Sequence, residues 1–271
     1  VMQGIILAAG MGSRLKKYTR NTPKCMVEVS GITLIERALR QLDKLELNRI
    51  IIVTGYSSEI LVAFINGLEI DTPIEFINND IYNKTNNIYS LYLAKDFLES
   101  DDTLLLESDL IFEDGILEKI INDKKESIAL VDKYESWMDG TCLVVGEEDE
   151  IESFVPGRKF DFSNSKNYYK TVNIYKFSKD FSCRYYIPFL EAYVKALGYN
   201  EYYEEVLRII TILDNPPIKV KKLEGELWYE IDDEADLDIA ESYFSKDEYD
   251  HLDKIQQDRK STRLNSSHYN I

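Results

Sequence analysis

The residues best suited to chemistry lie near the N-terminus, in the run LAAGMGSRL at residues 7–15 and at Lys24 behind Pro23. The small residues of this run are Ala8, Ala9, Gly10 and Gly12. Their size lets the backbone approach a phosphate or a flat base closely, and its N–H groups can then donate to an anion. Arg14 and Lys24 add the positive charge that a triphosphate requires. A tight strand-to-helix turn with scattered basic residues is the plain alternative.

Two common phosphate-binding loops do not match this run. A dinucleotide-binding fingerprint needs a third glycine where Leu15 stands. A P-loop needs Gly-Lys followed by Ser or Thr, and this segment has none. The run therefore predicts a different kind of nucleotide loop.

Two acids each follow an apolar segment. Asp109 comes soon after TLLLE at 103–107, and Asp232 comes directly after WYEI at 228–231. Ligands of open α/β sheets bind at the carboxyl ends of strands, so these carboxylates could hold one Mg²⁺ together. The chain has 49 acids, however, and two of them could end strands by chance. The residues alone leave both interpretations open.

The first half of the chain alternates apolar runs with helical patterns. Strands are expected at 3–8, 49–54, 73–77 and 103–107, and helices at 32–45, 59–68, 90–98 and 115–121. Strands that are apolar throughout and alternate with helices predict an α/β fold with a parallel sheet covered on both faces.

The pattern changes beyond Ser127. Strands are expected at 128–131, 141–145, 151–155, 169–177 and 227–231, and helices at 181–197, 202–213 and 235–244. We expect one domain over residues 1–250, with a nucleotide half at about 1–126 and an acceptor half at about 127–250.

Composition excludes several classes of protein. The 271 residues carry a formal net charge of -17, which argues against nucleic acid or an anionic membrane surface as the main partner. Two histidines cannot form a multi-histidine zinc site, and three widely spaced cysteines argue against a disulfide framework. No apolar run approaches the ~20 residues of a membrane span. A soluble, cytoplasmic globular protein is expected.

Residues 258–271 differ in character from the rest. The segment DRKSTRLNSSH at 258–268 has no apolar periodicity and looks like the translation of a DNA-sequencing adapter. We predict a non-native tail, with an ordinary flexible basic tail as the alternative. A non-native tail would mean that the natural chain continues beyond Gln257.

Together with TPK at 22–24, LAAGMGSRL resembles the N-terminal motif of the sugar-phosphate and choline-phosphate nucleotidyltransferases. The resemblance implies their Rossmann-like, three-layer fold with a mixed, mostly parallel sheet. It also implies that Arg14 and Lys24 neutralise phosphate charge, and that Asp109 in ESDL and Asp232 in YEID bind the metal. The loop residues that it places at the nucleotide are Leu7, Ala8, Ala9, Gly10, Gly12 and Ser13.

The segment YNKTNNIYSLYLAK at 82–95 resembles the bacterial CTP:phosphocholine cytidylyltransferases. Asn86 and Asn87 are candidates for base recognition, because an amide offers both a donor and an acceptor to cytosine. They could equally cap the helix that follows. Ser90, in the same run, is a further nucleotide-binding candidate.

Four later segments are similar to the cytidylyltransferase part of 2-aminoethylphosphonate enzymes. They are VDKYESWMDGT (131–141), YYKTVNIYKFS (168–178), NEYYEEVL (200–207) and WYEIDDEADLDIAE (228–241). That part is often joined to a downstream PLP-dependent aminotransferase, so a missing C-terminal domain of this kind is expected. The resemblance implies transfer of CMP from CTP to 2-aminoethylphosphonate or phosphocholine, with release of pyrophosphate.

Both acceptors combine an anion with a small cation. Trp137 and Asp139 could cradle the ammonium group by cation–π attraction and charge pairing. Lys170, and less surely Lys133, could meet the anionic oxygens, although each could instead be a solvated surface lysine.

Two other functions stay open. A sugar-1-phosphate nucleotidyltransferase would have an acceptor pocket of Asn, Gln and Glu without an aromatic wall. A noncatalytic nucleotide-binding regulatory relative would have lost catalytic residues, whereas Arg14, Lys24, Asp109 and Asp232 are all present.

Overall fold

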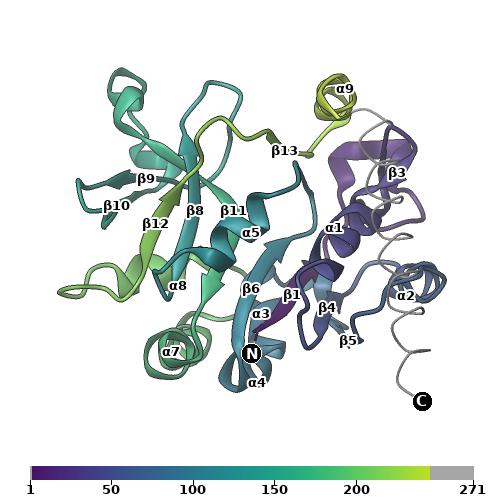
Figure 1. Ribbon diagram of the computed structural model, residues 1–271, viewed down its shortest axis with the longest axis horizontal. Coiled ribbons are helices and arrows are strands. Elements are labelled where there is room, and N and C mark those ends of the chain that lie inside the picture. The colour runs from purple at the N-terminus through teal and green to yellow at the C-terminus, as the bar shows by residue number, and fades with distance from the viewer. Residues whose placement is uncertain (1, 245–271) are drawn as a thin grey trace, which may run out of the picture.

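The computed structural model describes residues 2–244, so the predicted tail at 258–271 lies outside the described residues. Within them, a nine-stranded sheet has the order β10-β9-β11-β6-β1-β4-β5, and β8 pairs with both β11 and β12 (Figure 1). Its strands are β1 (Met2–Ala8), β4 (Ile50–Thr54), β5 (Ile74–Asn78), β6 (Asp102–Glu107), β8 (Ile128–Lys133), β9 (Cys142–Val145), β10 (Ile151–Val155), β11 (Tyr169–Phe177) and β12 (Lys219–Lys222).

The sheet is mixed, as predicted. β6, β1, β4 and β5 run parallel, while β11 is antiparallel to β6, β8 and β9. Because β11 pairs directly with β6, one sheet continues through both predicted halves of the chain. The sequence analysis missed β12, which pairs in parallel with β8.

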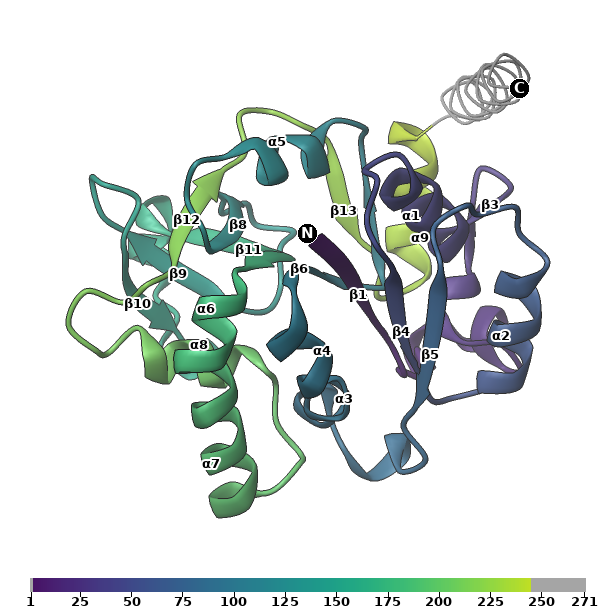
Figure 2. The same ribbon diagram turned by 60° about the horizontal axis from the view of Figure 1, so that its bottom comes forward.

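Helices cover both faces of this sheet (Figure 2). α1 (Leu34–Asp43), α2 (Ser58–Asn66) and α5 (Ile116–Asn122) pack on one face, with the even-numbered residues of β1. The odd-numbered residues of β1 point to the other face of the sheet. Its helices are α3 (Asn87–Leu93), α4 (Lys95–Ser100), α6 (Lys179–Phe181), α7 (Ile187–Leu197) and α8 (Glu204–Ile210). Side chains alternate along a strand, so a strand buried on both faces has to be apolar throughout.

Shorter elements complete the described chain. The helical turns are η1 (Ser13–Thr19), η2 (Lys24–Met26), η3 (Tyr82–Lys84), η4 (Gly157–Lys159), η5 (Phe162–Asn167) and η6 (Ser182–Tyr186). β2 (Glu28–Val29) pairs with β3 (Ile32–Thr33). No helix within residues 2–244 is long and apolar enough to cross a membrane.

A second small sheet brings the C-terminal segment to the site. β13 (Trp228–Glu230) pairs with β7 (Leu110–Phe112), and the Ile231 N–H donates to the Asp109 carbonyl at 2.9 Å. α9 (Glu234–Tyr243) follows. A separate apolar cluster joins α9 to the segment after the glycine loop, through Leu15, Val27, Leu34, Leu237 and Phe244 among others. The pairing of β13 with β7 therefore brings Asp109 and Ile231, about 120 positions apart in the sequence, side by side.

Candidate active site

The glycine loop starts where β1 ends, between β4 and β6 in the sheet. Gly12 has φ 61° and ψ 41°, the left-handed conformation that glycine adopts without a steric penalty. A Cβ on Gly12 would lie 2.8 Å from the Cβ of Lys24, so the absence of a side chain lets these two segments touch. The Gly12 carbonyl accepts hydrogen bonds from the Leu15 N–H and the Thr19 hydroxyl, which fix the turn.

Gly12→Ala is expected to destabilise the protein by at least about 1–2 kcal/mol, because the new Cβ both strains the left-handed backbone and pushes on Lys24. Chemical denaturation measures this loss. Gly10→Ala is the matched control, since a Cβ on Gly10 meets nothing within 4 Å. Equal stability of the two variants would contradict the argument.

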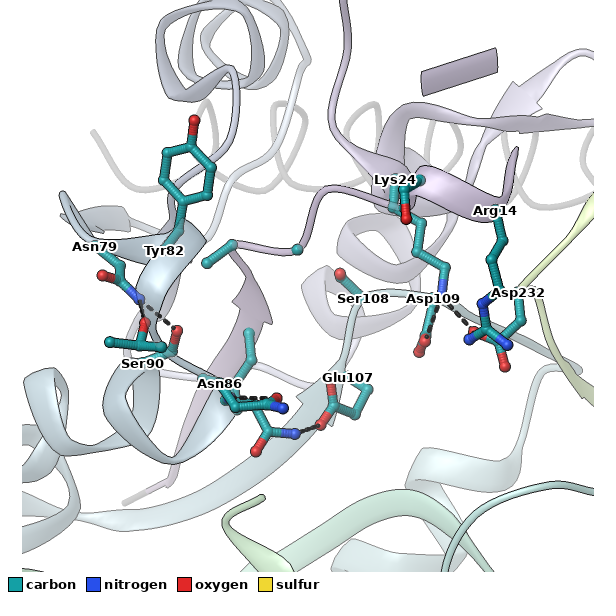
Figure 3. A pocket seen from close by; sticks show the side chains of 17 residues that line it. Arg14, Lys24, Asn79, Tyr82, Asn86, Ser90, Glu107, Ser108, Asp109 and Asp232 are labelled. Atoms are coloured by element: carbon teal, nitrogen blue, oxygen red, sulfur yellow. Dashed lines mark hydrogen bonds and ion pairs between the residues drawn. The ribbon is translucent and has the colours of Figure 1, made fainter. Parts of the chain in front are cut away.

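Lys24 lies between two carboxylates from distant parts of the chain. Its Nζ is 3.0 Å from Asp109 Oδ2 and 2.6 Å from Asp232 Oδ1, and Arg14 Nη2 is 3.1 Å from that same Asp232 oxygen (Figure 3). Burial lowers the pKa of Lys24, but its pairing with Asp109 and Asp232 outweighs this effect and raises the pKa above the ordinary value. The structure therefore brings together all four charged residues that the sequence singled out.

A third carboxylate joins this group. Asp109, Glu230 and Asp232 offer oxygens that all lie within 4.8 Å of one another. Asp109 Oδ1 is buried and has no hydrogen-bond partner in the described chain, so it is open to a ligand. Three hard oxygen donors in this arrangement fit a divalent cation such as Mg²⁺. Glu230 was not among the residues expected from the sequence, although it lies at the end of β13, two residues before Asp232.

A cavity of about 290 Å³ extends from these charged residues to α3. Figure 3 shows Arg14, Lys24 and Asp109 at one end, and Tyr82 and Asn86 at the other. The predicted nucleotide-binding residues that line it are Leu7, Ala9, Gly10, Gly12, Ser13, Asn86, Asn87 and Ser90. Ala8, the last residue of β1, does not line it, because its side chain is buried in the core. Lining residues that the sequence analysis did not select are Asn79, Tyr82, Thr85, Glu107 and Ser108.

The two candidate asparagines have different surroundings. Asn86 is the N-cap of α3, and its Oδ1 accepts from the Asn87 N–H at 2.8 Å. Asn87 uses both ends of its amide within the protein, donating to Glu107 Oε1 and accepting from the Tyr203 N–H. Asn86 therefore caps α3. Asn87 connects α3 to Glu107 of β6 and to Tyr203, which directly precedes α8. The Nδ2 of Asn86 donates no hydrogen bond to any group within residues 2–244, so that donor remains for a ligand.

A second cavity of about 300 Å³ adjoins the first. The two cavities share Arg14, Asn87, Glu107, Asp109 and Asp232. The other residues of the second cavity are Asp139, Gly140, Thr141, Lys170, Asn173, Tyr202, Glu204 and Glu230. Six of its lining side chains are acids and two are bases, so a cationic group is electrostatically favoured there.

Two of the four predicted acceptor residues line this second cavity, and two do not. Asp139 and Lys170 line it. Trp137 lies in a neighbouring cavity, where its ring stacks on Tyr229 with centroids 4.3 Å apart. Lys133 is exposed and lies over the Tyr169 ring. The expected cradle of Trp137 with Asp139 is therefore not formed, because aromatic packing holds Trp137 elsewhere.

Lys170 is the buried cation of the second cavity, with an exposed fraction of 1%. Its Nζ donates to the Thr171 carbonyl at 2.6 Å and lies 3.4 Å from Glu230 Oε2. Burial raises the pKa of both Glu230 and Glu204 to about 7, although Lys170 opposes the shift. An ammonium with three donors still has one to offer to an anionic ligand.

Cys25, next to Lys24, is fully enclosed. Burial raises the pKa of its thiol to about 12, so the reactive thiolate is scarce at neutral pH. This agrees with a packing role rather than a nucleophile.

Comparisons with known proteins agree with this geometry. A CTP:phosphoglutamine cytidylyltransferase from Campylobacter jejuni is 30% identical over 261 residues, which cover 88% of this chain and 98% of that protein. A CMP-5'-(3-aminopropyl)phosphonate synthase from Streptomyces rubellomurinus is 26% identical, over 90% of this chain and 39% of that protein. The solved structure of CTP:phosphocholine cytidylyltransferase from Streptococcus pneumoniae superposes with a TM-score of 0.73 at 27% identity, covering 89% of this chain and 98% of that one.

The family model that matches describes a MobA-like NTP transferase domain and aligns with residues 4–161. This range contains β1, the glycine loop, Lys24 and Asp109, which form the charged end of the first cavity. The chain belongs to the MobA-like NTP transferase family.

Proposed function

We propose that the chain is a cytidylyltransferase that transfers CMP from CTP to a small acceptor and releases pyrophosphate. The acceptor carries a phosphonate or phosphate at one end and a small cationic ammonium group at the other, as in 2-aminoethylphosphonate or phosphocholine. The observation that carries the proposal is that two cavities meet at Arg14, Asp109 and Asp232. A reaction between two bound molecules needs such a shared wall, where the reacting atoms can be held together.

The first cavity suits the nucleotide. Gly10 and Gly12 line it, so their backbone could donate to phosphate oxygens. Gly12 touches Lys24, and Figure 3 shows Lys24 and Arg14 together at one end of the cavity. The opposite end, at Tyr82 and Asn86, would receive the base. The relatives support cytosine, since the enzymes at 30% and 27% identity are cytidylyltransferases.

Asp109 and Asp232, with Glu230 beside them, would hold Mg²⁺. When bound, the cation would supply positive charge that stabilises the negative charge developing on the triphosphate. Lys24 now pairs with both aspartates, so cation binding at these oxygens requires its ammonium to turn toward the phosphates instead.

The acceptor oxygen is already anionic at neutral pH and needs no general base. It attacks the α-phosphorus of CTP, a new P–O bond forms, and the bond to the β-phosphate oxygen breaks to release pyrophosphate. Arg14 and Lys24 neutralise phosphate charge, and Lys170 offers a donor to the acceptor's anionic end. Positioning and charge stabilisation therefore supply the catalysis, which agrees with the absence of histidine from residues 2–244.

A sugar-1-phosphate nucleotidyltransferase is the second candidate. Asn173 and Thr141 give the second cavity polar groups that could match sugar hydroxyls, and among residues 2–244 Tyr202 is the one aromatic residue that lines it. The excess of acids over bases in this cavity favours a cationic acceptor over an uncharged sugar ring.

A pyrophosphate-release assay tests the proposal. CTP, UTP and ATP are each paired with 2-aminoethylphosphonate, phosphocholine and a hexose 1-phosphate in the presence of Mg²⁺. We expect turnover with CTP and either 2-aminoethylphosphonate or phosphocholine. Turnover with the hexose 1-phosphate alone would establish the second candidate, and no turnover with any pair would overturn both.

Asn86→Asp is expected to raise the KM for CTP about tenfold, because it removes one amide donor near the base while keeping an oxygen that caps α3. The measurement is KM for CTP together with the melting temperature, which should not fall. A lower melting temperature with an unchanged KM would assign Asn86 to capping alone.

A further inference from the structure

Glu204 is a buried acid that the scheme above leaves without a role. It is the first residue of α8, has an exposed fraction of 7%, and lines the second cavity. Its Oε2 is buried and makes no hydrogen bond of normal geometry within residues 2–244; the Tyr203 hydroxyl, which lies near enough to lower the pKa of Glu204, is likewise buried without a hydrogen-bond partner there. A buried carboxylate oxygen without a donor is costly, so this position suits a ligand that brings an N–H group.

The charges around Glu204 point to a cation. The nearest buried cation, Lys170, is already engaged by the Thr171 carbonyl and by Glu230. Asp139, across the same cavity, is exposed and adds a further negative charge. A small ammonium ion in this cavity would therefore be attracted by the carboxylates of Glu204 and Asp139, and could donate a hydrogen bond to Glu204 Oε2.

The aromatic residues decide which kind of ammonium fits. A quaternary ammonium has no N–H and is held on aromatic faces. In the second cavity the aromatic lining consists of Tyr202, whose side chain is 55% exposed. Trp137 packs against Trp228 and Tyr229 around the neighbouring cavity, and so provides no cage here.

We infer that Glu204 accepts a hydrogen bond from a primary ammonium of the acceptor and makes the chain select an amino-alkyl phosphonate over a choline-type phosphate. The inference rests on the proposed function, since it names the acceptor of that reaction. The anionic end of the acceptor would then lie toward Lys170 and Arg14, beside Asp109 and Asp232, and its ammonium toward Glu204.

A methylation series tests this selectivity at constant charge. Pyrophosphate release with CTP is measured for 2-aminoethylphosphonate and for its N-methyl, N,N-dimethyl and N,N,N-trimethyl derivatives. We expect kcat/KM to fall by at least about tenfold from the primary amine to the trimethyl compound, with a large step when the last N–H is lost. Equal or better turnover of the trimethyl compound would overturn the inference and leave the proposed function intact. Release with phosphocholine but with none of the four phosphonates would overturn the inference alone, and no release with any of the five compounds would overturn both.

Glu204→Gln separates hydrogen bonding from steric exclusion of the methyl groups. The variant keeps the shape of the side chain but replaces the charge-assisted hydrogen bond by a weaker one to an amide oxygen. We therefore expect turnover of the primary amine to fall about tenfold, and that of the trimethyl compound, which loses only the attraction of the charge, to fall less. Glu205→Gln is the matched control, because Glu205 is its neighbour on α8 and pairs with Arg208. An unchanged ratio between the two acceptors in Glu204→Gln would show that cavity size alone selects the amine, and would overturn the role of Glu204.

Discussion

Asp109→Asn and Asp232→Asn are each expected to lower Mg²⁺-dependent pyrophosphate release by at least about 100-fold, the scale of losing one strong electrostatic contact to a transition state. Each change replaces a charged metal-binding oxygen by a neutral amide in a group of three converging carboxylates. The measurement is kcat as a function of Mg²⁺ concentration. Because the changes also relieve repulsion among buried acids, the fold should survive, and circular dichroism checks this.

The neighbouring acid supplies the control. Asp233 follows Asp232 directly, yet its side chain is exposed and accepts from the Asp236 N–H as the N-cap of α9. Asparagine caps helices as well as aspartate does, so Asp233→Asn should retain both activity and stability. Equal loss of activity in Asp232→Asn and Asp233→Asn would contradict the metal assignment, because only Asp232 faces Asp109.

Lys24→Met is expected to change two measurements in opposite directions. Turnover with CTP should fall about 100-fold or more, because the triphosphate loses a charge partner. Affinity for Mn²⁺ without nucleotide should rise at least about tenfold, because the ammonium that now pairs with Asp109 and Asp232 competes for the same oxygens. Electron paramagnetic resonance of free Mn²⁺ measures the second effect.

Thermal stability gives an independent measurement of the same competition. Without metal, Lys24→Met leaves two facing carboxylates without their shared cation, and its melting temperature should fall below that of the unchanged protein. Added Mn²⁺ should then raise the melting temperature of the variant more than that of the unchanged protein. Lys17→Met, which changes an exposed lysine that contacts Tyr18, should alter neither measurement. Weaker Mn²⁺ binding by Lys24→Met would show that Lys24 helps to hold the cation.

Much of the nucleotide side was predictable because its signals are local. The apolar run of β1 indicates a strand buried on both faces. The glycines after it indicate a backbone that closely approaches a neighbouring group, as Gly12 approaches Lys24. Asp109 and Asp232 were candidates because both follow strands, and the family resemblance favoured them over a chance occurrence. The structure places them 3.0 Å and 2.6 Å from a shared lysine. A strand end, unlike a side-chain contact, is visible in the order of residues.

The acceptor side was less predictable because its contacts depend on packing between distant segments. Trp137 and Asp139 are two residues apart, yet the stacking of Trp137 on Tyr229 separates them into different cavities. β12 reads KVKK, a polar sequence whose strand character comes from pairing with β8.

The order of residues by itself determined the α/β architecture and the glycine loop, because burial periodicity is a property of neighbouring residues. The motif resemblance singled out Arg14, Lys24, Asp109 and Asp232. The tertiary structure alone decided that β13 pairs with β7, and so that Glu230 joins the two aspartates. It also decided that Glu204 is buried without a donor, because burial and partners depend on which segments pack around a side chain.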